Sequence, residues 1–198
     1  AVHSLGIHSF AICLDDINTK LQPADLKRFK DLAHCQVYFV NRLWGDLHKL
    51  DDRSRLIFCP SAYTTGEAKK HLEYIKTIAQ LNKNINVFWT GPSVCSATIT
   101  GADADEFADR IGRKPIVWDN YPVNDMFPWR PLLSPVKGRS ADLGAHVAGL
   151  MANPMKQWYA SRLPLATLAE YLNDPASYDP EKAQADAIGE YPSADRAT

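Results

Sequence analysis

The chain has 198 residues, of which 45% are hydrophobic and 23% charged, and its formal net charge at pH 7 is -1. These proportions are those of an ordinary globular protein and argue against an intrinsically disordered chain. The nearly neutral charge also argues against a nucleic-acid partner, because phosphate backbones are bound by strongly basic faces.

The apolar runs are strand-sized and far shorter than the roughly 20 residues that cross a bilayer. The N-terminus lacks the charged segment and apolar stretch of a secretion signal. We therefore expect a soluble protein without a membrane partner, either secreted or cytoplasmic.

Short apolar runs rich in β-branched and aromatic residues alternate with longer stretches of helical periodicity. This alternation is typical of parallel βα units. The predicted strands, in chain order, are 9–14, 56–60, 85–89, 115–118 and 131–134. The sequence thus predicts an α/β fold with five parallel strands.

The predicted helices carry apolar residues three or four positions apart. They cover, in chain order, 26–47, 68–79, 103–112, 141–151 and 156–172, with Pro154 and Pro164 as breakers. Gly112 is expected to end the third helix as a C-cap. Asp179-Pro180-Glu181 predicts the start of one more short helix, and residues from about Pro192 are expected to fray.

The four cysteines are Cys13, Cys35, Cys59 and Cys95, and no two of them form a Cys-x-x-Cys pair. Three of them lie in apolar, strand-like runs, so we interpret them as buried free thiols. Disulfides are the alternative that an even number of cysteines allows.

Reactive groups in parallel α/β folds gather where strands end at their carboxyl side. At these ends the sequence has Asp15-Asp16, Ser61-Ala62-Tyr63, Thr90-Gly91-Pro92, Asp119-Asn120 and Lys137-Gly138-Arg139. Adjacent carboxylates disfavour each other's ionisation, which hints at a function for the first pair. From that pair alone, capping of the next segment is the slightly favoured alternative.

The stretch from Trp118 to Asp125 places an aromatic wall beside amide and carboxylate groups, which suits a sugar. Tyr63, Trp89 and Thr90 are candidates for the same pocket, although Trp89 has the simpler alternative of packing in the core. Asp119 or Asn124 has the alternative of forming a turn.

The segment from Lys137 to Ser140 has two interpretations, a phosphate site and a capping or ion-pairing segment. The second is favoured because no glycine-rich cradle accompanies it. The six histidines form no zinc-binding motif, and no Gly-x-Ser-x-Gly elbow is present. We expect neither a metal nor a cofactor.

Five motifs follow one another in a recognisable order over most of the chain. They are Phe10 to Ile17, Phe58 to Tyr63, Trp89 to Pro92, Trp118 to Asp125 and Lys137 to Ser140. Together they resemble glycoside hydrolase family 84, which contains the O-GlcNAcases and bacterial β-N-acetylglucosaminidases.

The resemblance implies a (β/α)₈ TIM barrel, in which the five predicted strands are strands four to eight. Three earlier βα units and a sugar-contacting lysine of the family are not among these residues. Residues 1–175 are thus expected to form a partial catalytic barrel, and residues 176–198 a short helix and frayed tail. We expect the chain alone to have little or no activity.

The same resemblance implies removal of terminal β-linked N-acetylglucosamine by retaining, substrate-assisted catalysis through an oxazoline. Asp15 would orient and stabilise the acetamido group, and Asp16 would be the general acid and base. The implied substrate-binding residues are Tyr63, Thr90, Val94, Trp118, Asn120, Asp125 and Asn153. The implied partners are glycoproteins or glycans that bear N-acetylglucosamine, and the missing N-terminal part of the barrel.

Two other classes of function are alternatives. One is a catalytically silent, lectin-like barrel that binds N-acetylglucosamine, against which the retention of both Asp15 and Asp16 argues. The other is a divalent-metal enzyme that uses the same pair as oxygen ligands. It lacks further convergent acids and a phosphate cradle.

Overall fold

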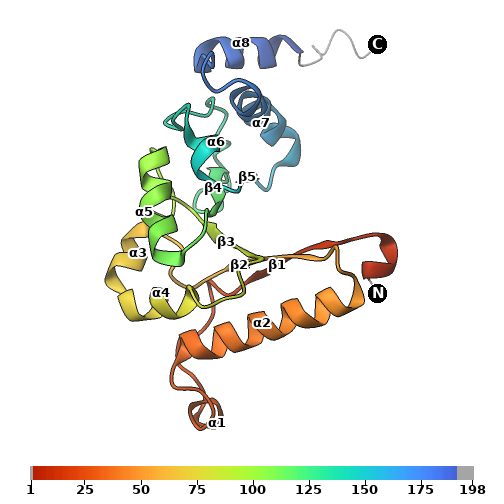
Figure 1. The fold of residues 1–198 in the computed structure, drawn as a ribbon. Coiled ribbons are helices and arrows are strands. Elements are labelled where there is room, and N and C mark those ends of the chain that lie inside the picture. Colours follow the sequence, from red (N-terminus) through yellow and green to blue (C-terminus); the bar gives the residue numbers. More distant parts are fainter. Residues whose placement is uncertain (1, 191–198) are drawn as a thin grey trace.

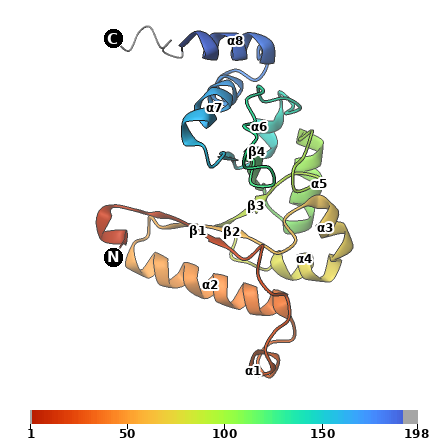
Figure 2. The same cartoon turned by 180° about the vertical axis from the view of Figure 1, so that it is seen from behind.

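The protein, described here by a computed structural model of residues 2–190, is built on one sheet of parallel strands. The strands are β1 (Ser9–Cys13), β2 (Arg55–Cys59), β3 (Ile85–Trp89), β4 (Ile116–Pro122) and β5 (Gly149–Asn153). Each strand pairs with the next one along the chain, so the order is β1-β2-β3-β4-β5. The sheet curls into a half-barrel with the helices along its outer side (Figures 1 and 2).

The predicted fold class and the first four predicted strands are confirmed. The fifth prediction, 131–134, is wrong, because these residues form an exposed loop. The fifth strand is Gly149–Asn153, whose first three residues lie in the region that the sequence assigned to a helix over 141–151. The helix there, α6 (Leu143–His146), is only four residues long.

The other helices are η1 (Val2–Leu5), α1 (Pro23–Leu26), α2 (Leu32–Leu50), α3 (Thr65–Lys70), α4 (Leu72–Ile78), α5 (Gly101–Ile111), α7 (Trp158–Asn173) and α8 (Pro180–Glu190). The predicted helix 26–47 is therefore interrupted between Leu26, where α1 ends, and Leu32, where α2 begins. Asp31 caps α2 by accepting a hydrogen bond from the backbone N–H of His34 at 3.0 Å. The predicted helix 68–79 is likewise two helices, which meet at His71 in a non-helical conformation.

Several predicted helix ends are confirmed. Gly112 ends α5 with a φ of 66°, a left-handed conformation that favours glycine. Asp179 caps α8 by accepting hydrogen bonds from the backbone N–H groups of Glu181 and Lys182 at 2.9 and 3.0 Å. In contrast, Pro164 lies inside α7 without ending it. The tail predicted from Pro192 onward lies outside the described residues.

The main core lies between the outer face of the sheet and the helices. Leu56, Phe58, Val87 and Trp89 point from the strands into this core, where they meet α2, α4 and α5 residues such as Phe107. Strand alternation sends the neighbouring residues to the opposite, concave face. A smaller cluster of Cys59, Phe88 and Ile116, joined by Ile57, Tyr63 and Trp118, occupies that face.

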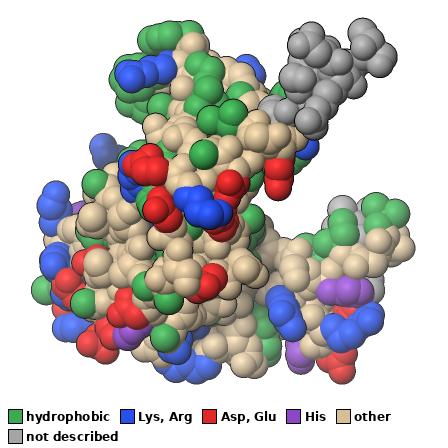
Figure 3. All heavy atoms as spheres, turned by 90° about the horizontal axis from the view of Figure 1, so that it is seen from above, with side chains coloured by type: hydrophobic (Ala, Val, Ile, Leu, Met, Phe, Trp, Pro, Cys, Tyr) green, Lys and Arg blue, Asp and Glu red, His purple; other side chains and the backbone are tan. Residues whose placement is uncertain are grey.

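The concave face is less completely covered than the outer one. Ala11, Cys13 and Met151 are exposed there. The space-filling view shows the molecule hollowed on one side (Figure 3), as expected for a barrel that five strands do not close.

The cysteines differ from the prediction in burial. All four are free, but only Cys59 is buried, whereas Cys35 is half-buried and Cys13 and Cys95 are exposed. Cys13 is exposed because it points to the open concave face. Among residues 2–190, no helix has the length and apolar character that a membrane crossing requires.

Candidate functional site

The residues implicated by the sequence lie within the strands or directly after their carboxyl ends. Asp15 and Asp16 follow β1, Tyr63 follows β2, Thr90 and Val94 follow β3, Trp118 and Asn120 belong to β4, Asp125 follows β4, and Asn153 ends β5. Because the strands are parallel and consecutive, these residues share one edge of the half-barrel.

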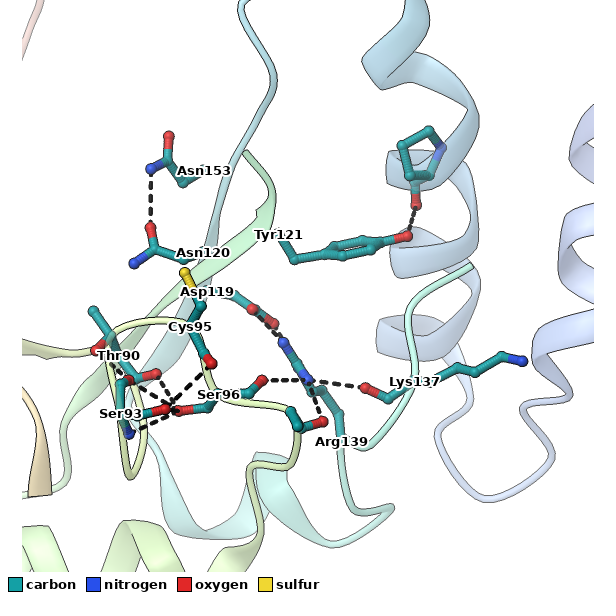
Figure 4. Close-up of polar contacts among 12 residues, drawn as sticks. Thr90, Ser93, Cys95, Ser96, Asp119, Asn120, Tyr121, Lys137, Arg139 and Asn153 are labelled. Atoms are coloured by element: carbon teal, nitrogen blue, oxygen red, sulfur yellow. Dashed lines mark hydrogen bonds and ion pairs between the residues drawn. The ribbon is translucent and has the colours of Figure 1, made fainter. Parts of the chain in front are cut away.

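Two amide hydrogen bonds join three of these positions, and Figure 4 shows the one between Asn153 and Asn120. Asn153 Nδ2 donates to Asn120 Oδ1 at 2.9 Å, and Asn120 Nδ2 donates to the carbonyl oxygen of Val94 at 2.7 Å. Both ends of the Asn120 amide are thus engaged, which fixes its orientation. The bonds connect the end of β5, strand β4 and the loop after β3.

The loop after β3 is held by short-range hydrogen bonds around Thr90. Thr90 Oγ1 donates to the carbonyl oxygen of Ser93 at 2.9 Å, and Ser96 Oγ donates to the carbonyl oxygen of Thr90 at 3.0 Å. Gly91 has a φ of 101°, and a Cβ added there would lie 2.3 Å from Ser96 Oγ. Only glycine fits this turn, which places Val94 beside Asn120.

Asp119 is directed away from the concave face and pairs with Arg139 (Figure 4). The guanidinium donates from Nε and Nη2 to the two carboxylate oxygens at 2.8 and 2.5 Å. Arg139 Nη1 also donates to the carbonyl oxygens of Lys137, Ser96 and Ala97. The ion-pairing part of the favoured interpretation of the 137–140 segment is therefore confirmed, whereas the helix that follows, α6, has no side-chain cap.

The backbone that leads into Asp15 is anchored by a partly buried polar network formed by Ser61 after β2, Gln36 of α2 and Tyr74 of α4. Ser61 Oγ donates to the carbonyl oxygen of Leu14 at 2.8 Å and accepts from Gln36 Nε2 at 3.1 Å. The Tyr74 hydroxyl donates to Gln36 Oε1 at 2.5 Å and accepts from the backbone N–H of Ser61 at 2.9 Å. Sequence reasoning missed Gln36 and Tyr74; a glutamine among the apolar positions of α2 was the available signal.

Negative charge from the carboxylate pair reaches several neighbouring groups. The pKa of the Tyr63 phenol is raised by burial and, to a lesser extent, by Glu67, Asp16 and Asp15. Burial and then Asp15 also raise the pKa of the Cys59 and Cys13 thiols. These groups therefore stay protonated at neutral pH and do not supply a thiolate nucleophile.

A cavity of about 210 Å³ lies on the concave face and reaches Asn153 at the end of β5. It is lined by Ala11, Cys13, Phe88, Trp118, Met151, Ala152 and Asn153. Phe88 meets Trp118 edge to face, with 5.1 Å between ring centroids. Phe88 and Met151 were not predicted as lining residues.

Trp89 does not contribute to this cavity. It is fully buried on the helix side, and its Nε1 donates to Thr65 Oγ1 at 3.0 Å, so the alternative of core packing is the correct one. In the part of the chain that the structure describes, no three His, Cys, Asp or Glu side chains are grouped to hold a metal ion.

Comparisons with known proteins identify a consistent set of relatives. A family model described as beta-N-acetylglucosaminidase matches residues 1–198. The Protein O-GlcNAcase of Mus musculus is 33% identical over 174 residues, which are 86% of this chain and 19% of the mouse protein. The Rattus norvegicus protein of the same name matches to the same extent.

A solved structure shows the same arrangement of elements. A point mutant of the O-GlcNAc hydrolase of Thermobaculum terrenum superposes with a TM-score of 0.89 at 37% identity. The match covers 95% of this chain and 41% of the hydrolase. The chain therefore spans less than half the length of each of these relatives.

Proposed function

Since the chain belongs to the β-N-acetylglucosaminidase family, glycoside hydrolase family 84, we propose that it carries the catalytic carboxylates of a hydrolase. The enzyme would remove terminal β-linked N-acetylglucosamine from glycoproteins or glycans. The observation that carries the proposal is that carboxylate, aromatic, hydroxyl and amide side chains lie at the carboxyl ends of five consecutive parallel strands.

The proposed reaction uses the substrate's own acetamido oxygen as the nucleophile. This oxygen attacks the anomeric carbon while the glycosidic C–O bond breaks, and Asp16 donates a proton to the leaving oxygen. The product of this step is a cyclic oxazoline. Water then attacks the anomeric carbon while the bond from that carbon to the oxazoline oxygen breaks and restores the acetamido group. Asp16 takes up the proton of the water, and the sugar leaves with retained configuration.

Asp15 has a different role in this scheme. Its carboxylate accepts a hydrogen bond from the acetamido N–H and balances the positive charge that develops on the oxazoline. One carboxylate must therefore stay anionic while its neighbour cycles a proton. The anchoring of Leu14 through Ser61 supports this division, because it holds the backbone immediately before the pair.

The remaining residues would select the sugar. We propose that Tyr63, Thr90 and Trp118 shape the acetamido pocket, which Val94 also lines. Asn120 would bond near the acetamido group, and the Asn153–Asn120 and Asn120–Val94 hydrogen bonds support this role by fixing the amide. A pocket built for an amide leaves its polar groups unpaired when glucose binds, which explains discrimination against glucose.

Asp125 and Asn153 would hold sugar hydroxyls in the same site. Asp125 is exposed at the start of the loop after β4, and Asn153 ends β5. Both positions are on the carboxyl side of the sheet, which supports a shared ligand.

We further propose that the site is completed by strands from outside this chain. The half-barrel leaves an edge free on both β1 and β5 within the described residues, and the concave face is open. In this scheme residues 1–175 form the barrel part, and residues 176–198 are an appended helix and tail.

The test measures hydrolysis of p-nitrophenyl β-N-acetylglucosaminide by the chain alone and by the chain joined to the first three βα units of the Thermobaculum terrenum hydrolase. The proposal predicts little or no turnover by the chain alone. It predicts turnover by the completed barrel that a thiazoline analogue of the oxazoline inhibits and that EDTA leaves unchanged. Robust turnover by the isolated chain would contradict the incomplete site, and sugar binding without turnover by the completed barrel would favour a lectin.

A further inference from the structure

The loop that follows β4 presents a group of exposed apolar side chains. Within this rim loop, residues 125–133, Met126 is 78% exposed, Phe127 57% and Trp129 77%. The exposure of several neighbouring apolar side chains to water is unfavourable, and such exposed groups mark binding surfaces. The loop begins at Asp125, so the group lies at the border of the proposed sugar site.

The rim loop is closed by backbone turns. The backbone N–H of Phe127 donates to the carbonyl oxygen of Asn124 at 2.8 Å, and the N–H of Arg130 donates to the carbonyl oxygen of Phe127 at 2.9 Å. The buried Asn124 side chain donates from Nδ2 to the carbonyl oxygen of Arg130 at 3.0 Å. These bonds bring both ends of the 124–130 segment together.

A second set of contacts fastens the rim loop to the start of α7. Gln157 Oε1 accepts from Asn124 Nδ2 at 3.1 Å, and Gln157 Nε2 donates to the carbonyl oxygen of Pro128 at 2.5 Å. The rings of Phe127 and Trp129 meet edge to face at 6.0 Å between centroids. The backbone that carries the aromatic pair is therefore held in place before any ligand arrives, which lowers the entropic cost of binding.

From this geometry we propose that Phe127 and Trp129 bind the polypeptide that carries the sugar, through an apolar or prolyl side chain beside the glycosylated residue. The inference rests on the proposed function, because the sugar held next to Asp125 brings the polypeptide to the rim loop. The pair would thus determine which glycosylated sites are cleaved efficiently.

The chemistry of the rim loop favours a polypeptide over a second sugar. Stacked sugars need polar groups beside the aromatic face to pair with their hydroxyls. In the rim loop, Asp125 is assigned to the sugar in the proposed site, and Arg130 is the other charged side chain. Between these two residues, the indole Nε1–H is the only side-chain hydrogen-bonding group apart from the weakly accepting thioether of Met126. An apolar side chain or a proline ring needs no such partner.

The experiment uses the completed barrel and compares four substrates. These are p-nitrophenyl β-N-acetylglucosaminide, chitobiose, a peptide with N-acetylglucosamine on a serine flanked by proline and valine, and the same peptide with glycine in place of both. The variant is Phe127→Ala/Trp129→Ala. The control is Phe39→Ala, which removes an exposed ring from α2, away from the rim loop.

The proposal predicts that the double variant loses at least about tenfold in kcat/KM on the proline-valine peptide, chiefly through KM. It predicts changes below about twofold on the aryl substrate and the glycine peptide, and none from Phe39→Ala. Equal losses on all substrates, no loss on the proline-valine peptide, or a loss confined to chitobiose would each overturn the inference. Absence of turnover of the aryl substrate by the unmodified completed barrel would instead overturn the proposed function.

Discussion

Replacing Arg139 with alanine is expected to destabilise the fold severely. The Arg139 and Asp119 side chains are only 7% and 1% exposed, and two hydrogen bonds join them. The variant leaves the Asp119 carboxylate buried without its partner. It also removes the hydrogen-bond donor for the carbonyl oxygens of Ser96, Ala97 and Lys137. Breaking a buried pair in this way costs about 3–5 kcal/mol. This is a large part of the roughly 5–15 kcal/mol by which domains are stable.

The assay is urea unfolding followed by circular dichroism. Lys137→Ala is the matched control, because it breaks an exposed ion pair with Glu181 from the same segment and is expected to cost at most about 1 kcal/mol. Arg139→Met/Asp119→Leu removes both charges and is expected to cost less than Arg139→Ala alone. A loss below about 1 kcal/mol for Arg139→Ala would refute the reasoning.

Other predictions concern the loops and the network behind the site. Gly138→Ala should lower the thermal midpoint, with a loss of about 1–3 kcal/mol, because φ is 75° and the new Cβ would lie 2.2 Å from the Ala97 carbonyl oxygen. In Gly189→Ala the new Cβ meets open space in α8, so the variant should raise the thermal midpoint, with a gain of up to about 1 kcal/mol in unfolding free energy. A decrease in midpoint as large as that of Gly138→Ala would contradict the argument. Tyr74→Phe removes the hydroxyl shared by Gln36 and Ser61 and should cost about 1–3 kcal/mol in urea unfolding; no change would show that the network is dispensable. Burial raises the pKa of Tyr74 to about 12, above the value near 10 of an unfolded tyrosine, so its stabilisation is present below about pH 10 and is lost as the pH rises to about 12. The unfolding free energy should therefore decrease less between pH 8 and pH 11 in Tyr74→Phe than in the unmodified chain. An equal decrease in both would contradict this.

The pattern of the sequence was sufficient for the strands that are buried on their helix side. β2 and β3 are rich in branched and aromatic residues, and their burial makes that composition necessary. β5 lacks this signal, because Gly149-Leu150-Met151-Ala152-Asn153 has no β-branched residue and its face at Met151 is open. Pro131 to Ser134 has apolar residues but lies in an exposed loop.

The shared location of the strand ends could be predicted from the sequence, because parallel topology alone places them on one edge. Other features depend on long-range contacts that the sequence does not reveal. The partner of Asp119 is 20 residues away, and the Ser61–Gln36–Tyr74 network joins β1, α2 and α4. The helix break at His71 was also hidden, since the apolar spacing continues through it.

The central claim, that Asp16 is the general acid, is tested most directly by the dependence of Asp16→Asn on the leaving group. The completed barrel is assayed on aryl β-N-acetylglucosaminides whose phenols span a wide range of pKa. The account predicts a loss of about 10²–10⁴-fold in kcat/KM for the least acidic phenol and a much smaller loss for dinitrophenol, which leaves without a proton. A loss of the same size for every leaving group would contradict it.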